Sequence, residues 1–229
     1  MLFWHSAFQG NNQLIAGWDA GSILTYYLLI IIAGGLLISH IEDLLDREVR
    51  QGTIVKYLLK PSPLYSQLLL IELPYRCMQG SFAVLFYLVT AYFFPLVRIH
   101  IADILSAFII FLILVCAFFL THTYKMMLGM VTFWTKDNKG IIETSQVLVL
   151  LFAGFNLPLT FLPGVLSDIA LSLPFAYFAY YPVISLQGKL PFDGMIHVLQ
   201  MEILWLGIFF IVYKILLQFG LKKFTAVGQ

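Results

Sequence analysis

Long apolar runs recur along this chain and constrain its fold more than any other feature. The run SILTYYLLIIIAGGLLIS (Ser22–Ser39) contains no charged residue, and a helix needs about 20 apolar residues to cross a bilayer. Of all residues 61% are hydrophobic and only 11% are charged, whereas about a quarter of a soluble domain is charged. Because so few charges cannot cover a water-facing surface, we expect an all-α integral membrane protein.

Five apolar segments have the length of spanning helices, although Pro74 interrupts the second. Residues 161–197 are also apolar, but several prolines break them, which favours an external hairpin of short re-entrant helices. Non-helical backbone at this depth requires cover from protein or water. We expect one transmembrane domain over residues 1–229, with spans at about 22–40, 67–95, 102–134, 141–160 and 198–219 and a cytoplasmic loop at 41–66.

Lysine and arginine are unevenly divided between the segments that join these spans. Arg98 and Lys189 are the only ones in the two segments expected on one side of the membrane. The segments on the other side hold Arg47, Arg50, Lys56, Lys60, Lys136, Lys139, Lys222 and Lys223. Cytoplasmic loops carry the excess of basic residues. We therefore expect a multi-pass protein of the cell membrane whose loop 41–66 and C-terminus are cytoplasmic.

The loop 41–66 contains a compact amphipathic element. The charged stretch Glu42–Arg50 is followed by Gly52, which can adopt backbone angles that other residues avoid, and then by the run TIVKYLL. Pro61 and Pro63 end the element because proline cannot continue a helix. Two interpretations fit this pattern. The element is an interfacial helix with its Leu and Tyr side chains on lipid, or it docks to a cytoplasmic partner.

Ionisable residues within membrane helices are costly and usually face protein or water. Glu72 and Arg76 are four residues apart with the acid first, the favoured order for an ion pair on a helix. This pair is either structural or a gating pair that re-forms between two states. We expect Lys125 to extend towards the cytoplasmic interface. We expect Glu202 to lie near the outer interface, where it caps the last span.

Several chemistries have no support in the sequence. Cys77 and Cys116 lie in apolar runs, where cysteine is usually a small buried hydrophobe, and no Cys/His spacing matches a metal site. No catalytic constellation is present either. The net charge of +1 gives no reason to expect nucleic acid as a partner. No GxxxxGK[ST] pattern occurs, so the chain does not bind ATP through a P-loop.

Five segments, taken in order, resemble one family. They are GWDAGSILTYYLL, EDLLDREVRQGTIVKYLLKPSPLYSQLLLIELPYR, FWTKDNKGI, the proline-rich LPLTFLPGVLSDIALSLPFAYFAYYPVISLQGK, and LKKFTAVGQ. The set resembles the permease subunits of type-2 ATP-binding-cassette (ABC-2-type) exporters, in the branch similar to antibiotic and drug exporters. The resemblance covers nearly the whole chain.

The resemblance implies a function and a set of partners. A separate cytoplasmic ATPase subunit would bind ATP and Mg²⁺, and a second permease subunit, identical or not, would complete a dimer around the export pathway. The loop 41–66 would carry the coupling helix, whose apolar residues fit a groove on the ATPase and whose lysines pair with its acids or with anionic lipid. The residues implied in coupling are Gly52, Lys56, Tyr57, Leu58, Leu59, Lys60, Pro61 and Pro63.

The N-terminus departs from the family pattern. Members usually begin with a cytoplasmic amphipathic helix and a further span, six spans in all. Here only MLFWHSAF, at residues 1–8, has the character of the outer end of such a span, so the chain is expected to be short at its N-terminus. This departure keeps open two alternatives to a permease: a membrane-embedded lipid-modifying enzyme and a non-transporting membrane scaffold.

Overall fold

The structure is a computed structural model that describes residues 17–94, 99–135 and 137–224. Arg98, Lys136 and the N-terminal segment MLFWHSAF lie outside the described residues. Every regular element in the described ranges is a helix, and no strand occurs among them. The expected all-α membrane fold is therefore confirmed.

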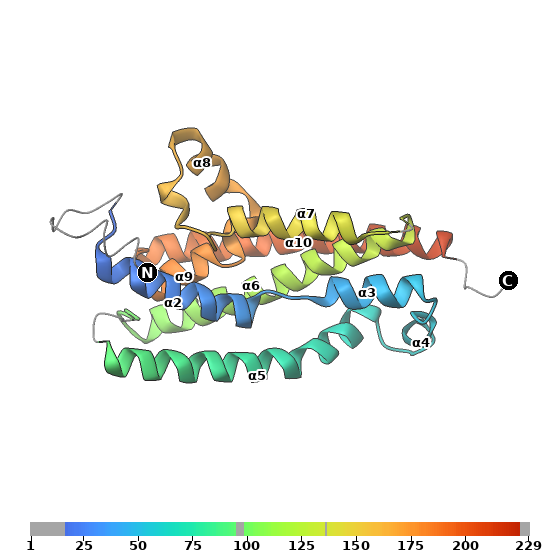
Figure 1. Ribbon diagram of the computed structural model, residues 1–229, viewed down its shortest axis with the longest axis horizontal. Coiled ribbons are helices and arrows are strands. Elements are labelled where there is room, and N and C mark those ends of the chain that lie inside the picture. The colour runs from blue at the N-terminus through green and yellow to red at the C-terminus, as the bar shows by residue number, and fades with distance from the viewer. Residues whose placement is uncertain (1–16, 95–98, 136, 225–229) are drawn as a thin grey trace.

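Long helices form an elongated bundle, and α3 and α4 join α2 to α5 at one end (Figure 1). The C-terminal end of α10 lies at this same end (Figure 1). The long helices pack roughly along the long axis of the molecule. The elements of the bundle are α2 (Ala20–Leu37), α3 (Ile41–Arg50), α4 (Val55–Leu58), α5 (Leu64–Phe93), α6 (Ile104–Met130) continued by η1 (Val131–Phe133), α7 (Lys139–Phe152) and α10 (Phe192–Lys223).

Between α7 and α10 the chain forms only short helices, and prolines mark their boundaries. Pro163 precedes α8, Pro174 opens η3, and Pro191 precedes α10. Proline has no backbone N–H to donate, so it is tolerated in the first turn of a helix but not within a long one. The elements of this segment are η2 (Leu159–Phe161), α8 (Gly164–Ser172), η3 (Pro174–Tyr177) and α9 (Tyr180–Leu186).

Three of the described helical segments are long and apolar enough to cross a membrane, namely Ala20–Arg50, Ile104–Phe133 and Phe192–Lys223. The five expected spans therefore stay a prediction. Helix α7 has 14 residues, which at 1.5 Å per residue is about 21 Å and less than the hydrocarbon thickness of about 30 Å. It stops just before Gly154, whose φ of 83° is a left-handed conformation common at helix ends.

Two apolar clusters hold the bundle together. The larger joins α2, α6, α7, α9 and α10, and within it the hydroxyl of Tyr26 donates to the Gly154 carbonyl at 2.6 Å. The smaller cluster joins α3, α4, α5, α6 and α10 around Leu45, Ile54 and Tyr213. Helix association in lipid depends on close packing, because lipid tails are as apolar as the side chains. The smaller cluster therefore fixes where α4 sits on the bundle.

Candidate functional site

The turn between α3 and α4 depends on Gly52. Its φ of 72° lies in the left-handed region, and its N–H donates to the Val49 carbonyl at 3.1 Å. A residue with a side chain would be disfavoured there by about 1–2 kcal/mol. The Ile54 N–H then donates to the Glu48 carbonyl at 3.0 Å. Gly52 therefore lets the chain fold back, so that α4 lies against the end of α3.

One face of α4 is buried in the protein itself. Tyr57 is only 8% exposed and packs in the smaller apolar cluster with Ile54. Gln67 of α5 donates to the Tyr57 carbonyl at 2.9 Å and to the Ser62 carbonyl at 2.8 Å. The part of Tyr57 in coupling stays a prediction, but its side chain, expected to fit a groove on the ATPase, is buried within the chain itself. The physical reason is that Ile54 and Tyr57, three residues apart, form the inward face of a single helical turn.

The two lysines of the element also have contacts within the chain. The Lys56 ammonium lies 2.7 Å from Glu48 Oε1, and the hydrogen bond to Glu48 raises the pKa of Lys56 above 10.5. The Lys56 and Lys60 ammonium groups lie 4.9 and 5.7 Å from the centre of the Tyr57 ring. Lys56 thus has an acidic partner on α3, where the sequence suggested one on another protein or on lipid.

The opposite face of α4 points outward. Leu59 is 80% exposed, and Lys60, Pro61 and Pro63 are exposed as well, whereas Leu58 is half-buried. We call residues 59–63 the α4 tip. The residues predicted for coupling therefore divide into a buried base and an exposed tip.

A buried carboxylate lies at the break between α2 and α3. Glu72 of α5 accepts hydrogen bonds from Ser39 Oγ at 2.7 Å and from the His40 N–H at 3.2 Å. Its oxygens also contact His122 Nδ1 at 2.7 Å and Arg76 Nη2 at 3.0 Å. Glu72 and Arg76 are 7% and 3% exposed. The ion pair expected from their spacing is present, and it is part of a larger network.

The network ties the start of α3 to two other helices. His40, the residue at the N-cap of α3, makes no capping bond with its own side chain. The carboxylate of Glu72 accepts a hydrogen bond from the His40 N–H instead, and Ser39 Oγ accepts one from the Ile41 N–H at 3.3 Å. Buried helix ends require such partners for their unpaired N–H groups. Glu72 therefore joins the α2–α3 break to α5 and, through His122, to α6.

A second ion pair joins α3 to α6. Lys125 Nζ lies 2.5 Å from Glu42 Oε1, and the two residues are 2% and 0% exposed. The expected extension of Lys125 to the interface is wrong. The physical reason is that α3 covers this face of α6, so that a charged Lys125 side chain needs a buried counter-charge. Sequence reasoning missed Glu42, although its position in the first turn of a charged helix was a signal.

A third set of contacts lies one turn further along α3. Thr132 Oγ1 donates to Asp46 Oδ1 at 3.0 Å, and Asn138 donates to Thr132 at 3.1 Å. The two helices approach closely here, since a Cβ placed on Gly129 would lie 2.6 Å from the Cβ of Leu45. Because Glu42, Asp46 and Glu48 are all buried on α3, this helix is held to the bundle along its length.

Glu202 differs from these acids and from the sequence expectation. It lies ten residues after the start of α10 at Phe192, and the N-cap position belongs to Pro191. It is 0% exposed, and neither carboxyl oxygen has a hydrogen-bond partner within the described chain. The expectation that Glu202 caps the helix is therefore wrong. The physical reason is its register on α10, which turns it into the interior.

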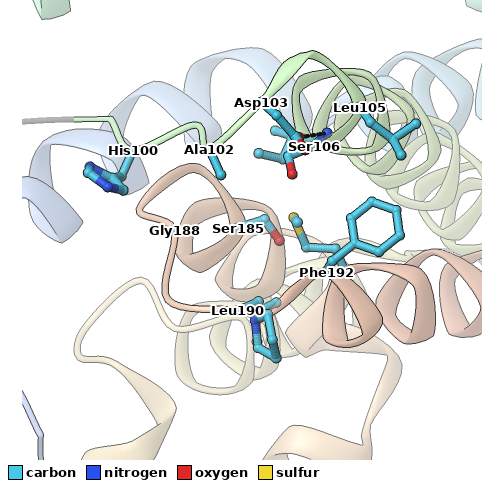
Figure 2. Close-up of a pocket in the computed structure, with 12 residues that line it drawn as sticks. His100, Ala102, Asp103, Leu105, Ser106, Ser185, Gly188, Leu190 and Phe192 are labelled. Atoms are coloured by element: carbon cyan, nitrogen blue, oxygen red, sulfur yellow. Dashed lines mark hydrogen bonds between the residues drawn. The ribbon is translucent and has the colours of Figure 1, made fainter.

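A separate pocket lies where α6 and α10 begin and α9 ends (Figure 2). Its volume is about 420 Å³. Ser106 and Ser185 form part of its wall, and Asp103 caps α6 by accepting from the Ser106 N–H at 2.7 Å (Figure 2). Most of the other lining side chains are apolar, among them Met195 and Phe192. The pocket shares no residue with the buried ion pairs.

Buried ion pairs that link a short charged segment to long apolar helices are features of a membrane protein whose charged segment is fixed to its helices. Among protein families, the model of the ABC-2 family transporter protein matches residues 1–228. The chain belongs to this family and is a permease component of an ABC transporter, embedded in the membrane. No curated protein and no solved structure matches the chain.

Proposed function

We propose that this permease is driven by a separate cytoplasmic ATPase, which binds the α4 tip and thereby displaces α3. The single observation that carries the proposal is the contrast within one short element. Leu59 is 80% exposed, while Tyr57, two residues earlier, is locked in the protein interior. An exposed leucine on a firmly held turn can fill a pocket of a partner with little loss of conformational freedom.

The contacts below the tip support the transmission of movement. Lys56 and Thr53 bind Glu48, so α4 and the end of α3 move together. Helix α3 in turn contacts α6 through the pair of Glu42 with Lys125. A displacement of the tip therefore reaches the bundle through hydrogen-bonded and paired groups, which transmit it better than a mobile loop would.

This division gives each predicted coupling residue a role. Leu59, Lys60, Pro61 and Pro63 would contact the ATPase, with the prolines keeping the exit from α4 stiff. Gly52 would permit the fold-back of the chain. The buried or half-buried remainder would hold the tip in place, namely Lys56, Tyr57 and Leu58.

Movement of α3 would also change the network around Glu72. The His40 N–H and Ser39 Oγ belong to the α2–α3 break, whereas Arg76 lies on α5 with Glu72. If the break shifts, Glu72 loses two donors and keeps its pair with Arg76. The Glu72–Arg76 pair would in this way act in gating: Glu72 would lose its hydrogen bonds to the α2–α3 break in one state and form them again in the other.

The remaining assignments are part of the same proposal. The partner ATPase binds ATP and Mg²⁺, a second permease subunit completes the pathway, and the direction of transport is export. The loop 41–66 and the C-terminus face the cytoplasm, in keeping with the distribution of lysine and arginine. Contacts of the lysines with anionic lipid of the inner leaflet fit this orientation.

Co-purification of the ATPase tests the proposal. Permease purified from its native host should carry an ATPase with Walker motifs in stoichiometric amount. Leu59→Asp should reduce this ATPase at least tenfold, because a charge would replace the apolar contact. Val165→Asp is the matched control, since Val165 is 73% exposed on α8, far from α4 in the chain. Wild-type levels of ATPase with Leu59→Asp would overturn the role of the tip.

A further inference from the structure

Glu202 is a buried acid of the bundle that the coupling mechanism does not use. It lies on α10, is 0% exposed, and both of its carboxyl oxygens lack a hydrogen-bond partner in the described residues. An ionisable side chain inside a membrane helix usually has a function, because its burial is costly. Glu202 therefore requires a physical explanation.

The groups around Glu202 offer no counter-charge. The titratable groups that interact electrostatically with it are the Tyr177 hydroxyl of η3 and the Cys116 thiol of α6. The nearby indole N–H of Trp205, three residues further along α10, is likewise without a partner. Among the described residues, no lysine, arginine or histidine forms an ion pair with Glu202.

Two other buried acids, Glu72 and Glu42, show what an ionised carboxylate requires. Glu72 contacts Arg76, His122 and two further donors, and Glu42 contacts Lys125. An isolated carboxylate without such partners is strongly disfavoured in an apolar interior, where the group takes up a proton instead. The same fold thus contains paired acids and one acid whose surroundings suit only the neutral form.

We propose that Glu202 is a proton-binding site, which holds its proton while η3 covers it and releases it when η3 moves away. The packing of η3 against α10, the helix that carries Glu202, supports the second part, and Tyr177 of η3 interacts electrostatically with Glu202. The Tyr177 ring stacks near that of Tyr181, with centroids 4.6 Å apart, and the Tyr181 hydroxyl donates to the Leu171 carbonyl of α8 at 3.2 Å. Displacement of the 161–197 hairpin would therefore uncover Glu202 and admit water.

The proton site does not depend on an ATPase or on transport, and only the assignment of hairpin displacement to the transport cycle rests on the proposed function. Its tests therefore use the purified permease alone. If the ATPase fails to co-purify but Glu202 behaves as expected, the coupling proposal fails and the proton site stands.

The first test uses dicyclohexylcarbodiimide, an apolar reagent that reaches carboxyl groups within membranes. The O–H of a neutral carboxyl adds across one C=N bond to give an O-acylisourea, and its acyl group then migrates from oxygen to nitrogen to give a stable N-acylurea without loss of any atom. Peptide mass spectrometry should find the adduct on Glu202 and not on the paired Glu72 or Glu42. Equal labelling of Glu72, or labelling elsewhere with none on Glu202, would overturn the proposal.

The second test compares two isosteric substitutions and needs no reagent access. Glutamine resembles the neutral acid, so Glu202→Gln should leave the melting temperature of the detergent-solubilised protein within about 2 °C of wild type. Glu72→Gln removes a negative charge that is paired with Arg76 and accepts hydrogen bonds from several donors, so it should lower the melting temperature by at least about 5 °C. A loss with Glu202→Gln as large as that with Glu72→Gln would show that Glu202 is ionised and would overturn the proposal.

The third test examines whether η3 shields Glu202 from water. A charged, water-soluble carbodiimide should not label Glu202 in the wild type or in Tyr177→Phe, which keeps the ring. It should label Glu202 at least several-fold more in Tyr177→Ala, because removal of the ring opens a path for water. Labelling of Glu202 in the wild type by this reagent would show that the site is not covered. Equal, low labelling in both Tyr177 variants would show that η3 is not the cover.

Discussion

At the scale of single residues, the buried charges of this permease are stabilised by one another. Lys125 and Glu42 are 2% and 0% exposed, and their charged groups are 2.5 Å apart. Burying a charge loses several kcal/mol of hydration free energy, and attraction to a well-placed counter-charge offsets only part of this loss. Such a pair is therefore sensitive to the loss of one member and tolerant of the loss of both.

Substitution of this pair gives a direct test. Lys125→Met leaves Glu42 buried without its counter-charge and should lower stability by about 3–5 kcal/mol. The double variant Lys125→Met with Glu42→Gln should recover most of this loss, since no charge is left unpaired. Thermal unfolding of the detergent-solubilised variants measures both effects. Equal losses in the single and double variants would show that the two charges do not interact.

The start of α2 contains an acid that responds to pH. Hydrogen bonding with the Ser22 side chain lowers the pKa of Asp19 below 3.8, partial burial opposes this, and backbone N–H groups including that of Gly21 add to it. A lowered folded-state pKa stabilises the protein at neutral pH, and this stabilisation is lost as the pH falls through that pKa. We expect faster amide exchange in the first turn of α2 below pH 3.8. Asp19→Asn should remove this pH dependence, and an unchanged dependence would contradict the assignment.

Only part of the site could be predicted from single residues. The spacing of Glu72 and Arg76 predicted their pair, because both lie on one helix. The partner of Lys125 and the burial of Glu202 depend on which helix covers each face, and helix spacing alone does not determine this. His122 was missed for the same reason, since its acid lies on another helix, 50 residues earlier.

At the scale of elements, α3 and α4 act as one unit because of the turn between them. The φ of 72° at Gly52 points α4 back along α3. Glu48 then accepts hydrogen bonds from both Thr53 and Lys56, the latter at 2.7 Å. The turn at Gly52 and the hydrogen bonds of Glu48 thus orient the α4 tip, which the smaller apolar cluster holds on the bundle.

A substitution at Gly52 should therefore displace the tip. Gly52→Ala should cost about 1–2 kcal/mol, because alanine disfavours the left-handed region, and it should reduce co-purification of the ATPase. Gly140→Ala is the control, since Gly140 lies in α7 and an added Cβ meets nothing within 4 Å. The control should retain the ATPase, because its added Cβ meets no other atom. Equal ATPase recovery from both variants would contradict the role of the turn.

Element boundaries were predictable where composition changes sharply and less so elsewhere. The prolines placed the short helices between α7 and α10, because each proline restricts the helix at a known point. Helix α7 was expected to reach about residue 160, yet it ends at Phe152. The apolar run continues past that end, so hydrophobicity alone gave no sign of the left-handed Gly154.

At the scale of the whole molecule, the two ends of the bundle differ in chemistry. One end has α3, α4 and the basic end of α10, with Lys222 and Lys223 in its last turn. The other end has the start of α2 and of α6 (Figure 1). The uneven basic charge predicts that the first end faces the cytoplasm.

Cysteine labelling on intact cells tests this orientation. In a background with Cys77→Ser and Cys116→Ser, Leu59→Cys should be protected from a membrane-impermeant thiol reagent until the cells are opened. Ser172→Cys, at the end of α8, should react from outside. Leu59 and Ser172 are both exposed, so access to the residue itself does not limit the reaction. The reverse pattern would invert the topology and remove the cytoplasmic ATPase from contact with α4.

The break between α2 and α3 has a consequence for biogenesis. Carbonyl groups just before the break accept hydrogen bonds from helices that follow in the chain. Arg76 of α5 donates to the Gly35 carbonyl at 3.0 Å, and Thr121 of α6 donates to the Leu37 carbonyl. During synthesis α2 enters the lipid before either donor has been made. Until α5 and α6 are made, α2 must therefore remain beside the translocon, where water can hydrate these carbonyls. The alternative is that α2 and α3 first form one straight helix, which pairs the same carbonyls internally.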